Sequence, residues 1–167
     1  HARYCATARR YRYFIANMSA RSALLRDRVC WFPRALDHEK MHQAGQCLLG
    51  SHDFSAFRAS DCQAKTPVRQ IGFLDIVRTG EMIMIDIQAN AFLHHMVRNI
   101  VGVLLDIGSG REPVEKMAQV LLSCDRSKAG RTARASGLYM VDVHYPEEYD
   151  LPQTPLLNLL KQGNDEQ

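Results

Sequence analysis

The alternation of apolar and polar residues along the chain predicts a protein built largely on β-strands. Four runs alternate and are rich in aromatic or β-branched residues: 3–16, 68–78, 82–89 and 138–145. In the first run, one face of a strand carries Arg9, Tyr11, Tyr13 and Ile15, and the other face carries Arg10, Arg12 and Phe14. The second and third runs are joined by Thr79-Gly80-Glu81 and predict a β-hairpin.

A second pattern, with a period of 3.6 residues, predicts three helices. They span residues 38–49, 90–108 and 113–124. Asp37 is suited to cap the first helix and Gly50 to end it, and Pro113 is suited to open the third. The inward residues of the first helix are expected to be Met41, Ala44, Leu48 and Leu49. The order of strands and helices predicts an α+β fold with a mainly antiparallel sheet and helices packed on one face.

The helix at 90–108 is apolar on every side, which predicts that it is buried, yet Arg98 stands in its middle. A buried guanidinium needs a partner acid, and no carboxylate lies three or four residues away on either side. Two interpretations remain open, a structural ion pair in the core and an active-site role. Asp53 and Asp61, in the long segment 50–67, are the candidate partners within the chain.

Composition excludes only a few of the possible functions. The formal net charge of +3 and the pI near 8.7 permit a nucleic-acid partner without requiring one. Five scattered cysteines without a C-x-x-C pair indicate thiols of a reducing cytoplasm rather than disulfides or a zinc site. The 90–108 run holds charged and histidine residues, so we interpret it as a core helix and not as a membrane span.

Three short motifs have both a functional and an ordinary interpretation. In RRYRY, at 9–13, arginines can hold an RNA backbone while a tyrosine stacks on a base, or they can simply flank a half-buried strand. His94 and His95 point about 100° apart on a helix, which favours packing roles over a metal site. The segment 129–132, AGRT, lacks the Walker spacing and is interpreted as a solvated basic loop with some capacity for phosphate.

Several separated motifs, in the same order, resemble the C-terminal portion of the tRNA pseudouridine synthase A family. They are HAR with RRYRY (1–3 and 9–13), GSHDFSAFR (50–58), the segment 66–69, NAFLHHMVRNIVG (90–102) and ASGLYMVDVHY (135–145). The chain also begins with His1 rather than Met, and we expect it to be the C-terminal part of a longer protein. The resemblance implies a domain over residues 1–150 and a tail over 151–167.

The resemblance implies an enzyme that converts uridine to pseudouridine at positions 38, 39 and 40 in the tRNA anticodon stem–loop. It implies a pseudouridine synthase fold, a homodimer, no cofactor and no metal, and a cytoplasmic protein without a membrane anchor. Tyr11 matches the family's tyrosine that stacks on the target uracil. Arg98 matches the arginine that pairs with the catalytic aspartate, and Leu138 matches the apolar residue near the flipped base.

The sequence departs from the family at one important point. The family's nucleophilic aspartate lies in an A-G-R-T-D-A-G motif upstream of the position that matches His1, and here AGRT at 129–132 is followed by Ala133. We therefore assign no catalytic aspartate to this chain and expect residues 1–167 to be inactive alone. The alternative is a non-catalytic RNA-binding or dimerisation module.

Overall fold

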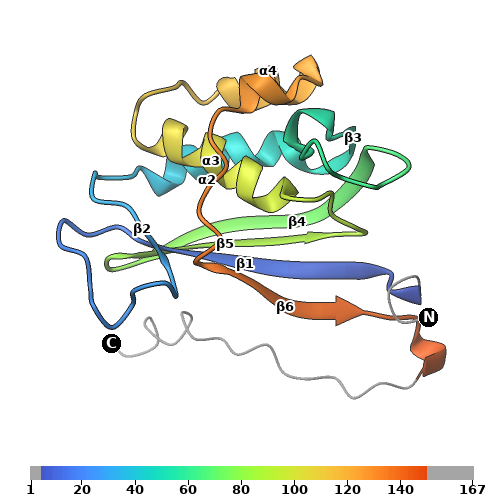
Figure 1. Cartoon of the computed structure of the whole chain (residues 1–167), viewed down its shortest axis with the longest axis horizontal. Helices are drawn as coiled ribbons and strands as arrows, with labels where there is room; N and C mark the ends of the chain where they lie inside the picture. The colour runs from blue at the N-terminus through green and yellow to red at the C-terminus, as the bar shows by residue number, and fades with distance from the viewer. Residues whose placement is uncertain (1–4, 150–167) are drawn as a thin grey trace, which may run out of the picture.

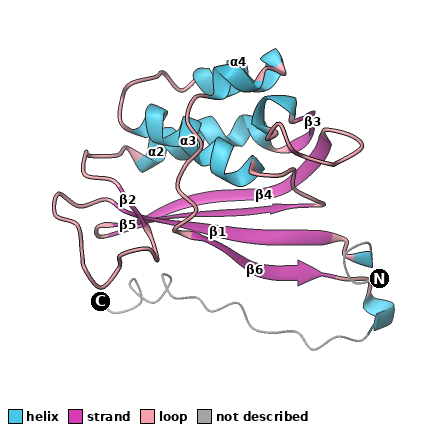
Figure 2. Cartoon of the chain, viewed as in Figure 1, coloured by secondary structure: helices cyan, strands magenta, loops and turns pink. Residues whose placement is uncertain are grey.

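The computed structural model describes residues 5–149, and its strands and helices occur in an order close to the predicted one (Figures 1 and 2). The strands are β1 (Ala8–Ala16), β2 (Cys30–Trp31), β3 (Gly50–Asp53), β4 (Val68–Thr79), β5 (Met82–Ala89) and β6 (Leu138–His144). The α-helices are α2 (His38–Gly45), α3 (Met96–Gly108) and α4 (Lys116–Ser123). The short 3-10 helices are η1 (Gln46–Leu48), η2 (Ser55–Phe57), η3 (Arg126–Ala129) and η4 (Glu147–Tyr149).

These strands form one mixed sheet in the order β2-β1-β5-β4-β3, with β6 also paired to β1. Only the short β1–β2 pairing is parallel among the described pairs, and every other pairing is antiparallel. Helices α2, α3 and α4 all lie on the same side of this sheet (Figure 2). The predicted α+β class, with a mostly antiparallel sheet and helices on one face, is therefore confirmed.

The two faces of β1 have different surroundings, as the alternation predicts. Tyr13 and Ile15 are fully buried beneath the helices. Arg12 lies on the opposite face, where its register partner on β5 is Asp86. We call this face, on which no α-helix of residues 5–149 packs, the open face (Figure 1). The β4–β5 hairpin turns at the predicted place, since Thr79 pairs with Met82.

Helix α3 is buried along almost its whole length, as predicted, but it begins at Met96 rather than at Asn90. The Asn90 side chain accepts hydrogen bonds from the backbone N–H groups of Gln70, at 3.0 Å, and of Ala91, at 2.8 Å. These bonds hold the chain in a turn at the end of β5, because an Asn side chain competes with the backbone for local donors. His95, the residue before the helix, has a φ of 59°.

Other boundaries also differ from the prediction. Strand β1 begins at Ala8, and α2 ends at Gly45 in a 3-10 turn, which leaves Leu49 37% exposed instead of buried. The segment 50–67 is not a simple loop, because it contains β3 and η2 and buries both Phe54 and Phe57 completely. The HAR motif at 1–3 and the tail at 151–167 lie outside the described residues.

Helix α4 offers a matched test of which side packs on the core. Leu121 is 6% exposed and its neighbour Leu122 is 83% exposed. Leu121→Ala should lower the free energy of unfolding by about 2–5 kcal/mol, because it removes buried methyl groups and leaves a cavity. Leu122→Ala should change it by less than about 0.5 kcal/mol. Urea unfolding measures both, and equal effects would contradict the observed packing of α4.

Candidate active site

The structure gathers the three residues singled out by the sequence around one buried side chain, Tyr13. Tyr11 lies two residues before Tyr13 on the same face of β1. Leu138, on β6, is the register partner of Tyr13. Arg98, in the first turns of α3, is close enough that its positive charge acts on the Tyr13 hydroxyl. Strands β1 and β6 and helix α3 thus bring an aromatic ring, an apolar side chain and a guanidinium to one place.

Tyr11 and Leu138 present apolar surface without being fully enclosed. Both are half-buried and pack against the core. The ring of Tyr11 meets the ring of Phe92 edge to face, with 5.1 Å between centroids. This contact fixes one edge of the Tyr11 ring, because edge-to-face pairs have a preferred geometry. A planar base can pack against a ring that is held in this way.

Arg98 is half-buried, and its Nε donates a hydrogen bond to the backbone oxygen of Ala133 at 2.8 Å. Within residues 5–149 no carboxylate forms an ion pair with it. Asp61 instead contacts His94, and the Asp53 side chain accepts from the Ser55 backbone N–H at 2.8 Å. The prediction that Asp53 or Asp61 is the partner of Arg98 is therefore wrong, because Asp53 bonds within its own segment and Asp61 pairs with His94.

Tyr13 was missed as a site residue, although it shares the alternating face of Tyr11. Its hydroxyl donates to the backbone oxygen of Arg134 at 2.7 Å. Burial raises the pKa of Tyr13 far above its usual value, and the nearby Cys30 thiol adds to this increase. Tyr13 therefore stays neutral and acts as a fixed hydrogen-bond donor that holds the Arg134 backbone beside Arg98.

The histidine pair flanks the site at the start of α3. The rings lie 4.0 Å apart, and His94 Nδ1 is 2.9 Å from Asp61 Oδ1, a contact that lowers the pKa of Asp61. Burial lowers the pKa of His95, and the positive charges of His94 and Arg98 lower it further. Within residues 5–149 no group of three or more potential metal ligands is close enough to hold an ion.

The segment 126–134, which we call the basic loop, passes directly beside Arg98. It contains four basic residues and no acidic one. Arg131 and Arg134 are exposed. Arg126, which precedes the segment 129–132 interpreted as a solvated loop, donates to Asn99 Oδ1 at 3.1 Å and to the oxygen of Gly130 at 2.9 Å. Part of this loop is thus built into the protein, and part presents positive charge beside the site.

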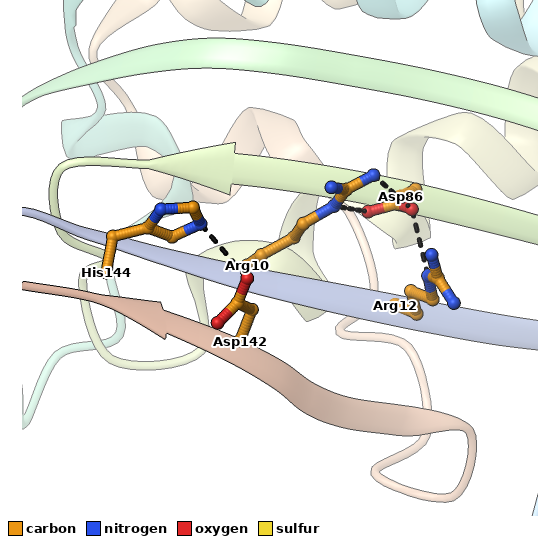
Figure 3. A network of polar contacts seen from close by, with 5 residues as sticks. All are labelled: Arg10, Arg12, Asp86, Asp142 and His144. Carbon is orange, nitrogen blue, oxygen red and sulfur yellow. Dashed lines mark hydrogen bonds and ion pairs between the residues drawn. The ribbon is translucent and has the colours of Figure 1, made fainter. Parts of the chain in front are cut away.

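Two of the three arginines of RRYRY, Arg10 and Arg12, face away from this site, whereas Arg9 lies on the tyrosine face of β1 and donates to the Asn90 backbone oxygen at 2.7 Å. On the open face, Arg10 makes two hydrogen bonds to Asp86, at 2.7 and 2.9 Å, and Arg12 makes one at 2.9 Å (Figure 3). Figure 3 also shows His144 paired with Asp142 at 3.1 Å. The charges of Arg10 and Arg12 are therefore already opposed by Asp86. The interpretation in which one strand offers both its tyrosine and these two arginines to the same RNA strand does not fit this geometry.

Comparison of the sequence with known proteins matches the chain to a family. The family model described as tRNA pseudouridine synthase matches residues 44–146, which is more than half of the chain. This chain belongs to the tRNA pseudouridine synthase family. It is 56% identical over 156 residues to tRNA pseudouridine synthase A of Actinobacillus pleuropneumoniae serotype 3 (strain JL03), covering 93% of this chain and 60% of that protein.

Further relatives match the chain with similar identity and coverage. The protein named tRNA pseudouridine synthase A in Histophilus somni (strain 2336) is 58% identical over 93% of this chain and 58% of its own length. The protein of that name in Aeromonas hydrophila subsp. hydrophila is 57% identical over the same shares. The chain thus spans about three fifths of the length of these relatives. In the part of the chain that the structure describes, no helix is long and apolar enough to cross a membrane.

The lowered pKa of His95 predicts how stability depends on pH. Because the unfolded chain binds this proton more readily than the folded one, stability should be complete above about pH 6.5 and should decrease as the pH falls toward the lowered pKa. His95→Asn, which tolerates the positive φ, should reduce this decrease. Urea unfolding between pH 5 and 7.5 measures it. An unchanged decrease in the variant would show that other groups cause it.

Proposed function

We propose that the protein isomerises uridine to pseudouridine at positions 38, 39 and 40 of the tRNA anticodon stem–loop, without a cofactor. The observation that carries this proposal is the setting of Arg98. Its guanidinium is half-buried beside Tyr13, near Tyr11 and Leu138, and no carboxylate of residues 5–149 pairs with it. Membership of the tRNA pseudouridine synthase family and the names of the relatives support the same reaction.

In this proposal each site residue has one role. A carboxylate nucleophile from outside the described residues pairs with Arg98, which keeps it ionised and aimed in partly apolar surroundings. The uridine leaves the base stack, and its uracil packs against the ring of Tyr11 and the side chain of Leu138. The bond between the sugar carbon and N1 breaks, the base rotates, and C5 bonds to the same sugar carbon. The hydrogen on C5 leaves as a proton and N1 takes up a proton from water, and the bond that the carboxylate forms is broken again before the product is released.

The charge around the site suits an RNA substrate. Arg131 and Arg134 are exposed beside Arg98, and the basic loop that carries them has no acid to neutralise them. Phosphates bind such side chains through salt-dependent ion pairs, which supply affinity without base specificity. The same loop is fixed to Arg98 through Ala133, so phosphate contacts and the reacting base fall close together.

Tritium release from tRNA labelled at C5 of uridine tests the reaction, because the new carbon–carbon bond displaces that hydrogen. The protein encoded by the complete gene should release tritium, and residues 1–167 alone should not. Arg98→Lys should lower kcat about a hundredfold, since a lysine cannot hold a carboxylate in two parallel hydrogen bonds. The matched control Arg111→Lys, at an ion pair with Asp106 away from the site, should keep full activity.

Three outcomes would overturn parts of this proposal. If the complete protein binds tRNA but releases no tritium, the chain is part of a non-catalytic RNA-binding module. If residues 1–167 alone are active, the carboxylate is within the chain. If Arg98→Lys merely lowers stability while the folded enzyme turns over normally, Arg98 has a structural role only.

We further propose that the protein forms a homodimer in which the open faces of two copies meet. The open face combines exposed aromatic side chains, Phe73 and Tyr139, with charges that largely cancel. Arg10 lies over the Phe73 ring at 4.8 Å while it pairs with Asp86. In a two-fold dimer the same surface of both copies meets, so a basic group of one copy can lie against an acidic group of the other. A surface that carries both signs of charge therefore suits a second copy of this chain better than an RNA backbone, which carries negative charge only.

Analytical ultracentrifugation measures the dissociation constant of this dimer. Phe73→Glu should raise the dissociation constant at least about tenfold, because it places an unpaired charge in the interface. Leu122→Glu, on the exposed side of α4, should leave the dissociation constant unchanged. A protein that remains monomeric at all concentrations, or equal effects of the two changes, would contradict the proposal.

The remaining expectations concern organisation and location. We propose that residues 1–150 form the catalytic-fold domain with 151–167 as a tail, since the family match lies within the first range. We also propose that the protein acts in the cytoplasm. Cys30, Cys47, Cys62 and Cys124 are free thiols, as cysteines are in a reducing compartment.

A further inference from the structure

One buried amide, that of Asn99, joins three segments that are far apart in the sequence. It is 1% exposed and directly follows Arg98 on α3. Its Nδ2 donates to the backbone oxygen of Phe57 at 2.7 Å. Its Oδ1 accepts from the Thr132 hydroxyl at 2.6 Å and from Arg126 at 3.1 Å. Asn99 therefore ties α3 both to η2 and to the basic loop.

These bonds form a closed triangle. Besides its bond to Asn99, the same Nη2 of Arg126 donates to the Thr132 hydroxyl oxygen at 2.9 Å. Each of the three side chains thus contacts the other two. A buried network of this kind is rigid when all its members are satisfied, because loss of one partner leaves the others unpaired at a cost.

The triangle fixes the part of the basic loop that contacts Arg98. Ala133, the residue after Thr132, donates its N–H to the Arg98 backbone oxygen at 3.1 Å, and its own oxygen accepts from Arg98 Nε at 2.8 Å. One turn later in α3, Gly102 has no side chain, and this allows the backbone of the basic loop to contact the helix. A Cβ at this position would clash, because it would lie 2.0 Å from the backbone oxygen of Arg131. The loop backbone therefore runs directly on the helix.

We propose that Asn99, Arg126 and Thr132 are positioning residues that set the direction of the Arg98 guanidinium. An arginine side chain has many rotamers, and a bidentate pair with a carboxylate needs one of them. With Nε held by the Ala133 oxygen, the two Nη groups point in a fixed direction before any acid arrives. This deepens the proposed function, on which it rests, and accounts for Asn99 and Gly102 within the motif RNIVG at 98–102.

A purely structural role predicts different results from a positioning role. If the triangle only joins the basic loop to the core, its loss lowers stability and leaves the turnover of the folded enzyme intact. If it positions Arg98, its loss lowers kcat in protein that remains folded, with little effect on KM, because the pairing acts on the reacting carboxylate rather than on tRNA affinity. The exchange of the Arg98 Nε proton with water reports the position of Arg98 without any need for activity.

The test compares Thr132→Val, which has the same shape but no hydroxyl, with Thr132→Ser, which restores the hydroxyl. Both are made in the protein encoded by the complete gene, with Thr79→Val as a control at the exposed hairpin turn. NMR follows the exchange of the Arg98 Nε–H, assigned by its absence in Arg98→Lys. Thr132→Val should speed this exchange about tenfold and lower kcat by about ten- to a hundredfold. Thr132→Ser should recover most of both, and Thr79→Val should change neither.

Equal behaviour of Thr132→Val and Thr132→Ser, or unchanged exchange in Thr132→Val, would overturn the proposal. So would faster exchange with full kcat, since Arg98 would then not need the triangle. A wild-type protein that isomerises no uridine would instead overturn the proposed function, and the exchange measurement would still decide whether the triangle holds Arg98 in place.

Discussion

The burial of α3 on every side is the constraint on which the rest of this structure depends. A helix that is apolar all round must be covered by the sheet on one side and by other segments elsewhere. The polar residues that it carries are then stable only where the fold supplies a partner. The Asn99 side chain makes three hydrogen bonds, two with the basic loop and one with η2. Within residues 5–149 the Arg98 guanidinium makes one, which its Nε donates to the Ala133 oxygen, and this incomplete satisfaction of a half-buried cation is what marks the site.

The two faces of β1 separate two functions that the sequence places side by side. Tyr11 and Tyr13 alternate with Arg10 and Arg12, so a pleated strand necessarily sends the tyrosines under the helices and the arginines to the open face. On the helix side, Tyr13 remains neutral because of its burial and holds the backbone beside Arg98. On the open face, Asp86 opposes both arginines. A single strand therefore contributes to the proposed RNA site and to the proposed interface between copies.

Positive charge near the site is distributed unevenly, and this has a physical reason. Arg126 enters the protein because Asn99 and Thr132 provide oxygen acceptors for it, whereas Arg131 and Arg134 have no such partners and stay in water. The buried arginine stiffens the basic loop, and the exposed ones can meet phosphate. Burial lowers the pKa of His95, and the charges of His94, Arg98 and Arg126 lower it further. The site thus combines a rigid framework with a solvent-exposed basic edge.

The sequence alone determined the fold class, the β4–β5 hairpin and the buried helix, because hydrophobic periodicity and turn residues act locally. It also showed that this helix carries an arginine, Arg98, with no acidic partner nearby in the sequence. The resemblance to the pseudouridine synthases supplied Tyr11 and Leu138. Only the tertiary structure decided that Asp53 and Asp61 are engaged elsewhere, that Phe54 and Phe57 are core residues in a segment expected to be a loop, and that Asn99, Arg126 and Thr132 form one network. Contacts between residues dozens of positions apart leave no periodic pattern in the chain, so the fold had to bring them together before they could be recognised.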